Sequence, residues 1–235
     1  MITLVGVGHV FAISDRVNEV ILSRRPDVVC LELDPVRYQS LLQKDGTRRV
    51  PMQYSLLAMF QKRMAGKFGS EVGGEMLAAA SAAREVGARV ALIDVDASRM
   101  LATLWKRMSV REKCGLLFSA LVGLVSSKET VEKEMEMYQS DDEAYIERIG
   151  EMFPTVKAVL IDDRNRIMAE RIQGVAKEHT NVVVIIGDGH VPGIARALEA
   201  EQLEVVRLKQ LMSASPQPDS SGEHSASFVW NHPYG

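Results

Sequence analysis

The chain has 235 residues, of which 46% are hydrophobic and 25% are charged, a composition typical of a soluble globular protein with one sizeable core. Its formal net charge is −3, so it lacks the overall positive field that recruits nucleic acid, and we expect no nucleic-acid partner. The two cysteines, Cys30 and Cys114, have no metal-ligand spacing, and buried reduced thiols are favoured over a disulfide.

The sequence predicts neither a signal peptide nor a membrane span. The N-terminus has no basic region before its first apolar run and no small-residue cleavage site soon after it. The strongest candidate for a membrane segment, from Cys114 to Ser127, is shorter than the roughly 20 residues that a spanning helix needs. We therefore expect a cytoplasmic protein.

Short, continuous runs rich in β-branched residues predict strands that are buried on both faces. In chain order they are Ile2–Val7, Val28–Leu33, Arg89–Ile93 and Asn181–Ile186, with Glu204–Leu208 as a candidate fifth. Helical patterns separate these runs. The alternation predicts an α/β fold, with a mainly parallel sheet of about four to six strands that is flanked by helices.

Apolar residues at helical spacing, together with start and stop signals, predict the connecting helices. They are a helix that Ser14 or Asp15 caps and that runs to Arg24, one from Pro35 toward Lys44, one over Gly74–Val86 that stops at Gly87, and a long one from Val156 to about Glu178.

Two segments differ from this alternation. Residues from about Ala97 to Phe153 are strongly helical and highly charged, so we expect a helical insertion in a single domain of residues 1–212. This lobe would cap the sheet or form a homodimer contact. Residues 213–235 are rich in Ser and Pro, which predicts a flexible polar tail whose histidines are poor site candidates.

The pattern Gly-x-Gly-His follows a predicted strand twice. In a parallel sheet, ligands bind outside the carboxyl ends of strands, where glycines allow close approach. One such histidine alone favours a structural role, but the repeat favours two imidazoles on one divalent metal ion, such as Mn, Co, Zn or Fe. We therefore expect the two histidines to lie within about 12 Å of each other, because a two-metal pair spans only about 4 Å. The motif residues are Gly6, Gly8 and His9 in the first turn, and Gly187, Gly189 and His190 in the second.

Carboxylates end two of the predicted strands. Glu32 and Asp34 follow the second strand, and Asp94 and Asp96 follow the third. A buried carboxylate must be paired, bind a metal or have a raised pKa, because burying a lone charge is costly. Arginines are available as partners, namely Arg37, Arg99 and Arg164. A salt-bridge network and a functional site therefore explain these residues equally well.

Five motifs in order cover about Ile2 to Leu208: LVGVGHV, PDVVCLELDPVRYQSL, GGEMLAAASAAREVGARVALID, DDRNRIMAERI and VVVIIGDGHVPGIARAL. Together they resemble the TraB/PrgY family, which includes plasmid pheromone-shutdown proteins. That family is similar, more distantly, to Tiki metalloproteases, erythromycin esterases and ChaN-like haem-binding proteins, which share paired Gly-x-x-His motifs on an α/β core.

The resemblance implies a metal-assisted hydrolase or a peptide-binding site in which His9 and His190 are the two motif histidines. It also implies polar signature positions at Glu32, Arg37, Glu75, Arg164 and Asn165. Glu75 begins a helix, and for this residue alone a capping role is favoured.

The chain departs from the family pattern at two places. Family members often have Asp-Arg after the third strand, whereas this chain has Asp94-Val95, so the role of that arginine is not implied here. Many archaeal members carry hydrophobic segments after the core. This chain has a polar tail there, so the resemblance does not imply membrane attachment.

Three functions fit these residues. The first is a metal-dependent hydrolase acting on peptides, in which His9, His190, Glu32 and Glu75 would hold the ion. Glu32 would alternatively be the general base, and Arg37 or Arg164 would steady the oxyanion. The second is a non-catalytic protein that sequesters a peptide or small ligand in the same cleft. The third is an assembly protein that uses the helical lobe. Further polar candidates for the site are Asp94, Asn165 and the glycines of the two turns.

Overall fold

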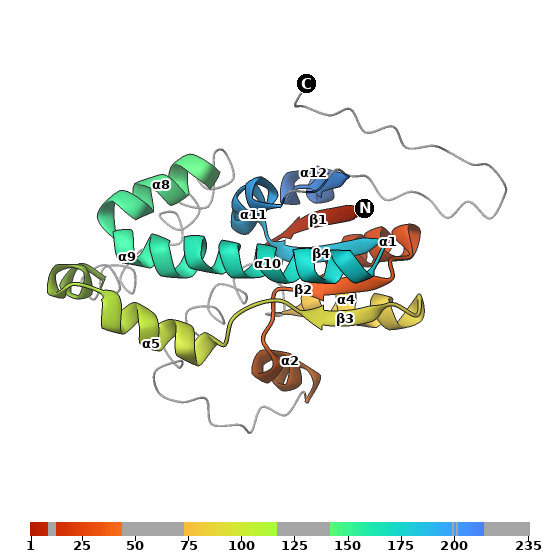
Figure 1. Cartoon of the computed structure of the whole chain (residues 1–235), viewed down its shortest axis with the longest axis horizontal. Helices are drawn as coiled ribbons and strands as arrows, with labels where there is room; N and C mark the ends of the chain where they lie inside the picture. The colour runs from red at the N-terminus through yellow and green to blue at the C-terminus, as the bar shows by residue number, and fades with distance from the viewer. Residues whose placement is uncertain (9–12, 44–72, 117–141, 199, 201, 214–235) are drawn as a thin grey trace.

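The computed structural model describes residues 1–8, 13–43, 73–116, 142–198, 200 and 202–213. Its centre is a five-stranded sheet in the order β3-β2-β4-β1-β5, with every strand parallel to its neighbours (Figure 1). The predicted α/β class is confirmed. The strands are β1 (Ile2–Val7), β2 (Val28–Leu31), β3 (Arg89–Leu92), β4 (Val182–Gly187) and β5 (Leu203–Val206).

Burial follows the position of each strand in the sheet. All residues of β1 and β2 are buried, as are the first five of β4, because these strands have a neighbour on each side and helices on both faces. The prediction of burial on both faces is wrong for β3, an edge strand in which Arg89 is exposed and the other three residues are half-buried.

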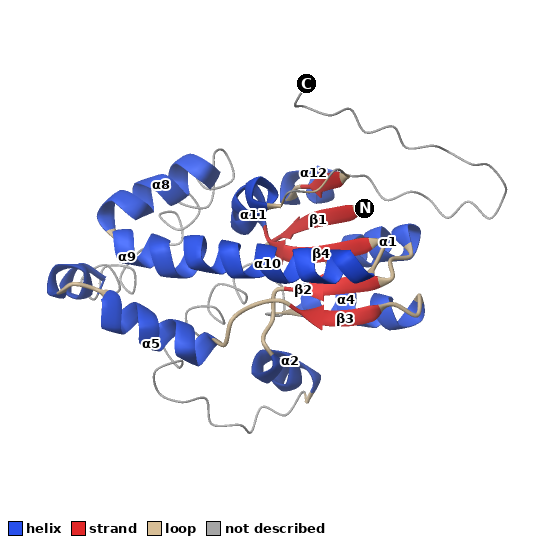
Figure 2. Ribbon diagram, in the orientation of Figure 1, coloured by secondary structure: helices blue, strands red, loops and turns tan. Residues whose placement is uncertain are grey.

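Helices cover both faces of the sheet, which forms a single layer between them (Figure 2). Successive strand residues point to opposite faces, so Val29 and Val183 pack on one face and Cys30 and Val184 on the other. The first face is covered by α1 (Ser14–Arg24), α4 (Gly74–Glu85) and α12 (Leu208–Ser213), and the second by α10 (Asp163–Glu178) and α11 (Val191–Ala197).

The connections that leave β2 and β4 diverge. The chain leaves β2 through α2 (Pro35–Leu42), which packs against the first face and leads toward β3. It leaves β4 through α11, which lies on the second face, and continues to β5. In the sheet, β5 lies on the opposite side of β4 from β2 and β3. Adjacent strands with diverging connections form a topological switch point, the place where open α/β sheets bind ligands.

Beyond the carboxyl ends of the strands lie α5 (Ala97–Arg107), α8 (Asp142–Met152) and α9 (Pro154–Lys157) (Figure 1). A π turn, η1 (Ala158–Asp162), joins α9 to α10, so the predicted long helix begins earlier and is interrupted. The centre of the predicted insertion and the C-terminal tail lie outside the described residues. The lobe as a unit and its dimer contact stay predictions.

Of the smaller predictions, some are confirmed and others are wrong. Ser14 is the first residue of α1 and not its cap, because Ile13 occupies the N-cap without a side-chain hydrogen bond. Gly87 ends the α4 turn with a φ of 75°, in agreement with its predicted role. Cys30 is buried as expected, whereas Cys114 is exposed. No helix within the described ranges is both long and apolar enough to cross a membrane.

Candidate functional site

Side chains from β2, β4 and α10 meet at the switch point. Glu32 follows β2 directly, and one of its oxygens, Oε2, accepts a hydrogen bond from the backbone N–H of Gly187 at 2.6 Å. Gly187 is the last residue of β4, and His190 follows it at the end of η2 (Asp188–His190), a 3₁₀ turn. The side chains of Glu32 and His190 are 6% and 8% exposed, so their polar groups interact mainly with protein atoms.

Hydrogen bonds determine the tautomer of His190. Its Nδ1 lies 2.7 Å from Oδ1 of Asn165, and since an amide oxygen only accepts, Nδ1 carries the hydrogen. The other ring nitrogen, Nε2, then has a lone pair, which accepts from Nη1 of Arg164 at 2.9 Å. The same Nε2 is 3.5 Å from Oε1 of Glu32. These contacts place the ring hydrogen on Nδ1 and the basic nitrogen Nε2 between Arg164 and Glu32.

Arg164 joins the carboxylates to the histidine. A guanidinium has five N–H groups, and this one finds five acceptors among the described residues: both oxygens of Asp94 at 3.0 and 2.7 Å, the carbonyl of Leu160 at 3.2 Å, Nε2 of His190, and Oε1 of Glu32. Burial alone lowers the pKa of Arg164, but the negative charges of Glu32 and Asp94 outweigh it and raise the pKa above its usual range. Arg164 is therefore charged and saturated with hydrogen bonds.

Asp94 is the most heavily paired carboxylate. It binds Arg164 with both oxygens, and its Oδ2 also pairs with Nη2 of Arg37. Burial raises its pKa, but the hydrogen bonds and charge of Arg164, followed by those of Arg37, lower the pKa to about 2. Asp94 is 3% exposed, and with this pKa it is ionised at neutral pH.

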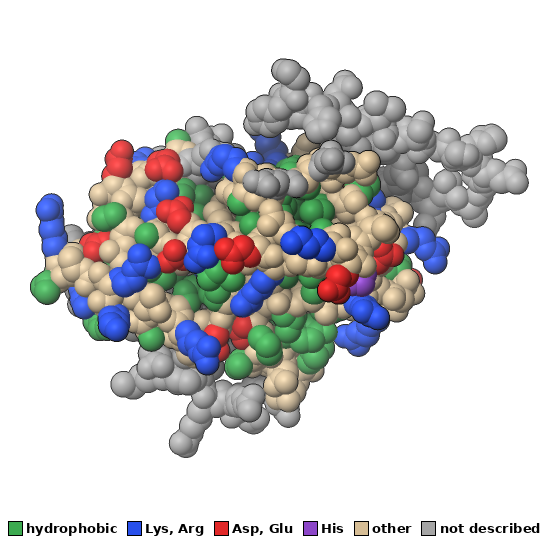
Figure 3. Space-filling view, viewed as in Figure 1, with side chains coloured by type: hydrophobic (Ala, Val, Ile, Leu, Met, Phe, Trp, Pro, Cys, Tyr) green, Lys and Arg blue, Asp and Glu red, His purple; other side chains and the backbone are tan. Residues whose placement is uncertain are grey.

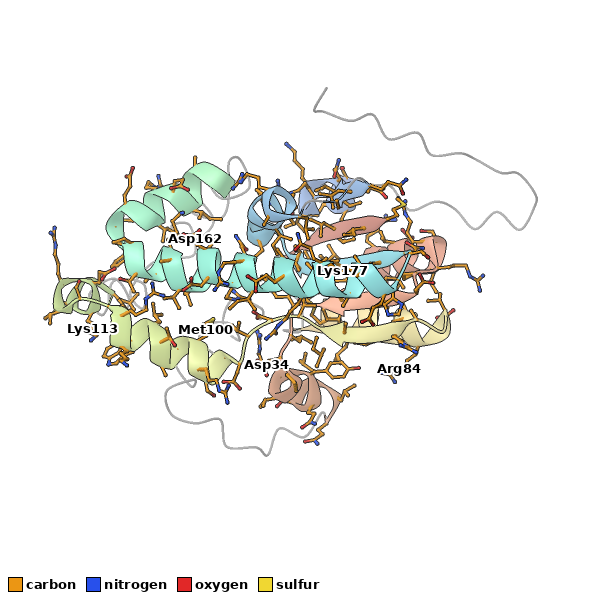
Figure 4. The ribbon with its side chains drawn as sticks, viewed as in Figure 1. Asp34, Arg84, Met100, Lys113, Asp162 and Lys177 are labelled. Atoms are coloured by element: carbon orange, nitrogen blue, oxygen red, sulfur yellow. The ribbon has the colours of Figure 1, made fainter. Side chains whose placement is uncertain are left out.

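Arg37 forms the exposed side of the cluster. It lies in the first turn of α2, which Asp34 caps by accepting from the backbone N–H groups of Val36 and Arg37 at 2.9 and 3.0 Å. Asp34 also accepts from Nε of Arg37 at 2.6 Å, at the start of α2 where Figure 4 labels it. The Arg37 side chain is 38% exposed, and its Nη1 bonds to no other described residue. Arg37 can therefore donate to a ligand.

The described side chains of this cluster include three carboxylates, Glu32, Asp34 and Asp94, and two guanidinium groups, Arg37 and Arg164. A carboxylate and a histidine nitrogen at one edge of the sheet are groups that bind divalent cations in proteins.

A second acidic group, which the sequence reasoning missed, lies within the second Gly-x-Gly-His turn. Asp188 pairs with Nε and Nη2 of Arg207 at 3.0 and 2.9 Å and accepts from the backbone N–H of Leu208 at 2.8 Å. It also explains a glycine of the first turn, since a Cβ at Gly6 would lie 2.0 Å from Oδ1 of Asp188. The position of Asp188 between two glycines was the available signal.

This contact makes Gly6→Ala a specific test of packing. The added methyl group forces Asp188 away from Arg207, so we expect the free energy of unfolding to fall by about 1–3 kcal/mol. Gly174→Ala is the matched control, because nothing lies within 4 Å of its added Cβ and alanine favours a helix. Urea titrations of the three proteins measure the difference. Equal stability of Gly6→Ala and wild type would refute the contact.

The structure describes most but not all of the predicted site residues. It brings together Glu32, Arg37, Asp94, Arg164, Asn165, Gly187 and His190, with Gly189 in the turn before His190. Glu75 lies in the first turn of α4 and is 2% exposed. Because α4 leads into the parallel strand β3, the first turn of α4 lies at the carboxyl-end edge of the sheet, as the cluster does. It is on the face opposite α10 and α11.

Two predicted residues contribute less to the described site, and for a third the structure gives no placement. Asp96 caps α5 by accepting from the backbone N–H of Arg99 at 2.8 Å, a structural role. Gly8 follows β1 and is half-buried. His9 lies outside the described residues, so its distance from His190 stays a prediction. The strands that precede the two turns are nevertheless neighbours, with Val7 opposite Gly187.

Comparison with known proteins agrees with the sequence motifs. An uncharacterized protein of Methanocaldococcus jannaschii is 30% identical over 232 residues, a match that covers 89% of this chain and 58% of that protein. The chain thus spans little more than half the length of this relative. Among solved structures, ChaN of Campylobacter jejuni, described with cofacial heme binding, is similar with a TM-score of 0.39 and 13% identity, covering 88% of this chain and 80% of ChaN. The model of the TraB/PrgY/gumN family matches residues 1–207, and the chain therefore belongs to that family.

Proposed function

We propose that this protein is a metal-dependent hydrolase that acts on peptides at the pair Glu32 and His190. One observation carries the proposal. Nε2 of His190 and Oε1 of Glu32 lie 3.5 Å apart at the switch point of the sheet. Imidazole and carboxylate together suit Zn, Mn, Co or Fe.

The spacing of the two donors fits such an ion. Two ligands about 2.1 Å from a tetrahedral ion are about 3.4 Å apart, close to the separation found here. Asn165 holds the other nitrogen of His190, as outer partners of ligating histidines do. No group of three or more His, Cys, Asp and Glu suited to a metal occurs among the described residues. We therefore assign the third donor to His9.

Three side chains have distinct roles in the proposed reaction. A divalent ion there would supply Lewis-acid activation of a peptide carbonyl and of a water molecule. Glu32 would hold the ion through Oε1 or take the proton from water at the same atom. Arg164 would give up its bonds to Glu32 and His190 and turn two N–H groups toward the substrate. Arg37, which has an N–H group to spare, would donate to the developing oxyanion.

A second candidate is a protein that sequesters a peptide or small ligand without turnover. The observation that favours it is the saturation of Arg164, whose guanidinium already satisfies both Glu32 and His190. The same cleft would then bind its ligand through Arg37 and the backbone of the turns.

Metal analysis of the purified protein tests the proposal. After loading with Mn, Co, Zn or Fe(II), the wild-type protein should retain ion through dialysis, and His190→Ala, His9→Ala and Glu32→Gln should retain little. His179→Ala is the matched control, because His179 ends α10 at the opposite edge of the sheet. It should retain ion like wild type.

Incubation of the loaded proteins with a peptide library, read by mass spectrometry, tests turnover. We expect cleavage products from the wild type and from His179→Ala only. Failure of the wild-type protein to retain any divalent ion would exclude a metal-dependent hydrolase. Retention of the ion without cleavage of any peptide would favour the sequestering protein.

A further inference from the structure

A groove lies beside Asn165, the residue that binds Nδ1 of His190. This groove of about 510 Å³ lies between α8, α10 and α11, within the roughly 300–1,000 Å³ typical of ligand pockets. Its lining includes Asn165, Gly189 and Gly193. Since Asn165 binds Nδ1 of His190, the groove approaches the ring from the edge opposite Glu32 and Arg164.

The polar group at this place is the amide of Asn165. The residue is 8% exposed, and its Oδ1 is used by His190. Its Nδ2 makes no hydrogen bond to another described residue, and this atom is not fully enclosed by the protein. Nδ2 lies against Gly193, where a Cβ would be 2.1 Å away. An acceptor in the groove would give this almost buried donor a hydrogen-bond partner.

Five of the charged side chains that line the groove are paired with one another. Lys157 bonds to Asp162 at 3.2 Å and to Glu147 at 3.4 Å, which bridges η1 to α8. Arg166 bonds to Glu170 at 2.9 Å. Figure 4 labels Asp162 where η1 meets α10, and acidic and basic side chains lie next to one another across the face that α10 crosses (Figure 3). These pairs favour an uncharged ligand over an ion.

Apolar side chains complete the lining. Ile146 of α8, Ile161 of η1 and Ala169 of α10 face the groove together with Pro192. A ligand that suits these surfaces carries neutral hydrogen-bond acceptors on a chain with small apolar side groups. An uncharged stretch of peptide has this chemistry, because its carbonyl groups accept and its side chains fill apolar space.

We propose that the groove binds an uncharged segment of a peptide, and that Nδ2 of Asn165 donates a hydrogen bond to one of its backbone carbonyls. Asn165 is then a positioning residue that connects the bound segment to His190. The proposal rests on the proposed function in that the peptide is taken to be a substrate. Binding itself requires neither metal nor turnover.

A pair of glycine variants tests the place of the Asn165 amide in the groove. Gly193→Ala places a methyl group on Nδ2 and forces the Asn165 side chain away from its position, although alanine suits the helix α11. Gly174→Ala makes the same change in α10, where nothing lies within 4 Å. Because Gly193 also lines the groove, a difference between the two variants reports on Asn165 together with the space beside it.

The probe is the uncharged peptide acetyl-Ala-Ala-Ala-amide, titrated into ¹⁵N-labelled protein. We expect the side-chain NH₂ signals of Asn165, assigned by their loss in Asn165→Ala, to shift saturably in the wild type. Binding should weaken at least tenfold in Gly193→Ala and stay within twofold of wild type in Gly174→Ala. The proposal is overturned if the wild type does not bind, if the Asn165 signals do not move, or if both variants bind equally.

Kinetics on the metal-loaded protein separate this proposal from the proposed function. For a peptide that is cleaved, Gly193→Ala should raise KM at least tenfold relative to Gly174→Ala. Cleavage with equal KM in both variants refutes the groove and leaves the hydrolase. Binding at Asn165 with no cleavage of any peptide refutes the hydrolase and leaves the groove.

Discussion

Replacing Arg164 with alanine is expected to lower the free energy of unfolding by about 3–5 kcal/mol, the cost of leaving a buried charge without its partner. The side chains of Glu32 and Asp94 are 6% and 1% exposed, and both receive hydrogen bonds from this guanidinium. Without it, Glu32 and Asp94 lose their hydrogen bonds from a buried charged donor, although Glu32 keeps the N–H of Gly187 and Asp94 keeps Arg37. Urea unfolding at pH 7 measures the loss.

Arg166→Ala is the control for this variant. Arg166 lies on the same helix, and its pair with Glu170 is more than 60% exposed on both sides. Exposed pairs contribute about 0–1 kcal/mol, so this variant should unfold almost like wild type. Similar losses in the two variants would mean that the Arg164 cluster contributes no more than a surface pair.

The sequence was sufficient to predict the strands, because burial on both faces demands continuous apolar runs. It did not distinguish β3 as an edge strand, since the three residues after Arg89, Val-Ala-Leu, are as apolar as the interior runs. It also extended β2 to Leu33, whereas the structure ends it at Leu31. At that point the Glu32 side chain turns to the N–H of Gly187, a contact with a strand about 150 residues away.

The composition of the site was predictable and its pairing was not. Carboxylates at the ends of buried strands must find partners, which identified Glu32 and Asp94 and limited the partners to a few arginines. Which arginine meets which carboxylate depends on the strand order β3-β2-β4-β1-β5. Interior strands of similar composition do not encode that order. Asp188 was overlooked for the same reason, because its partner Arg207 follows β5, on the far side of β1.

The two Gly-x-Gly-His turns lie on adjacent strands but differ in what their glycines do. Gly6 leaves room for the carboxylate of Asp188, so it serves the packing of one turn against the other. Gly187 donates its backbone N–H to Glu32 and so fixes the carboxylate that faces His190. One repeated pattern thus provides both the fit between neighbouring turns and the orientation of a site residue.

Acid should destabilise the protein through Asp94. Its pKa is about 2 in the folded protein against an ordinary value of 3.8, so the folded state favours the ionised form. A group whose pKa is lowered by folding stabilises the protein fully at pH values above its pKa in the unfolded state. This contribution is lost as the pH falls through the pKa of the group in the folded state. At about 1.36 kcal/mol per pKa unit, Asp94 contributes about 2 kcal/mol at neutral pH, which disappears between about pH 4 and pH 2.

Asp94→Asn tests this contribution, because asparagine keeps the shape of the side chain and cannot ionise. The variant should be less stable than wild type at pH 7, since Arg37 and Arg164 lose a shared counter-charge. Its remaining stability should then fall by about 2 kcal/mol less than that of wild type as pH is lowered from 5 toward 2. Urea midpoints at several pH values measure both curves. Parallel curves would show that the ionisation of Asp94 is not linked to folding, and that the charge of Arg164 is balanced elsewhere in the cluster.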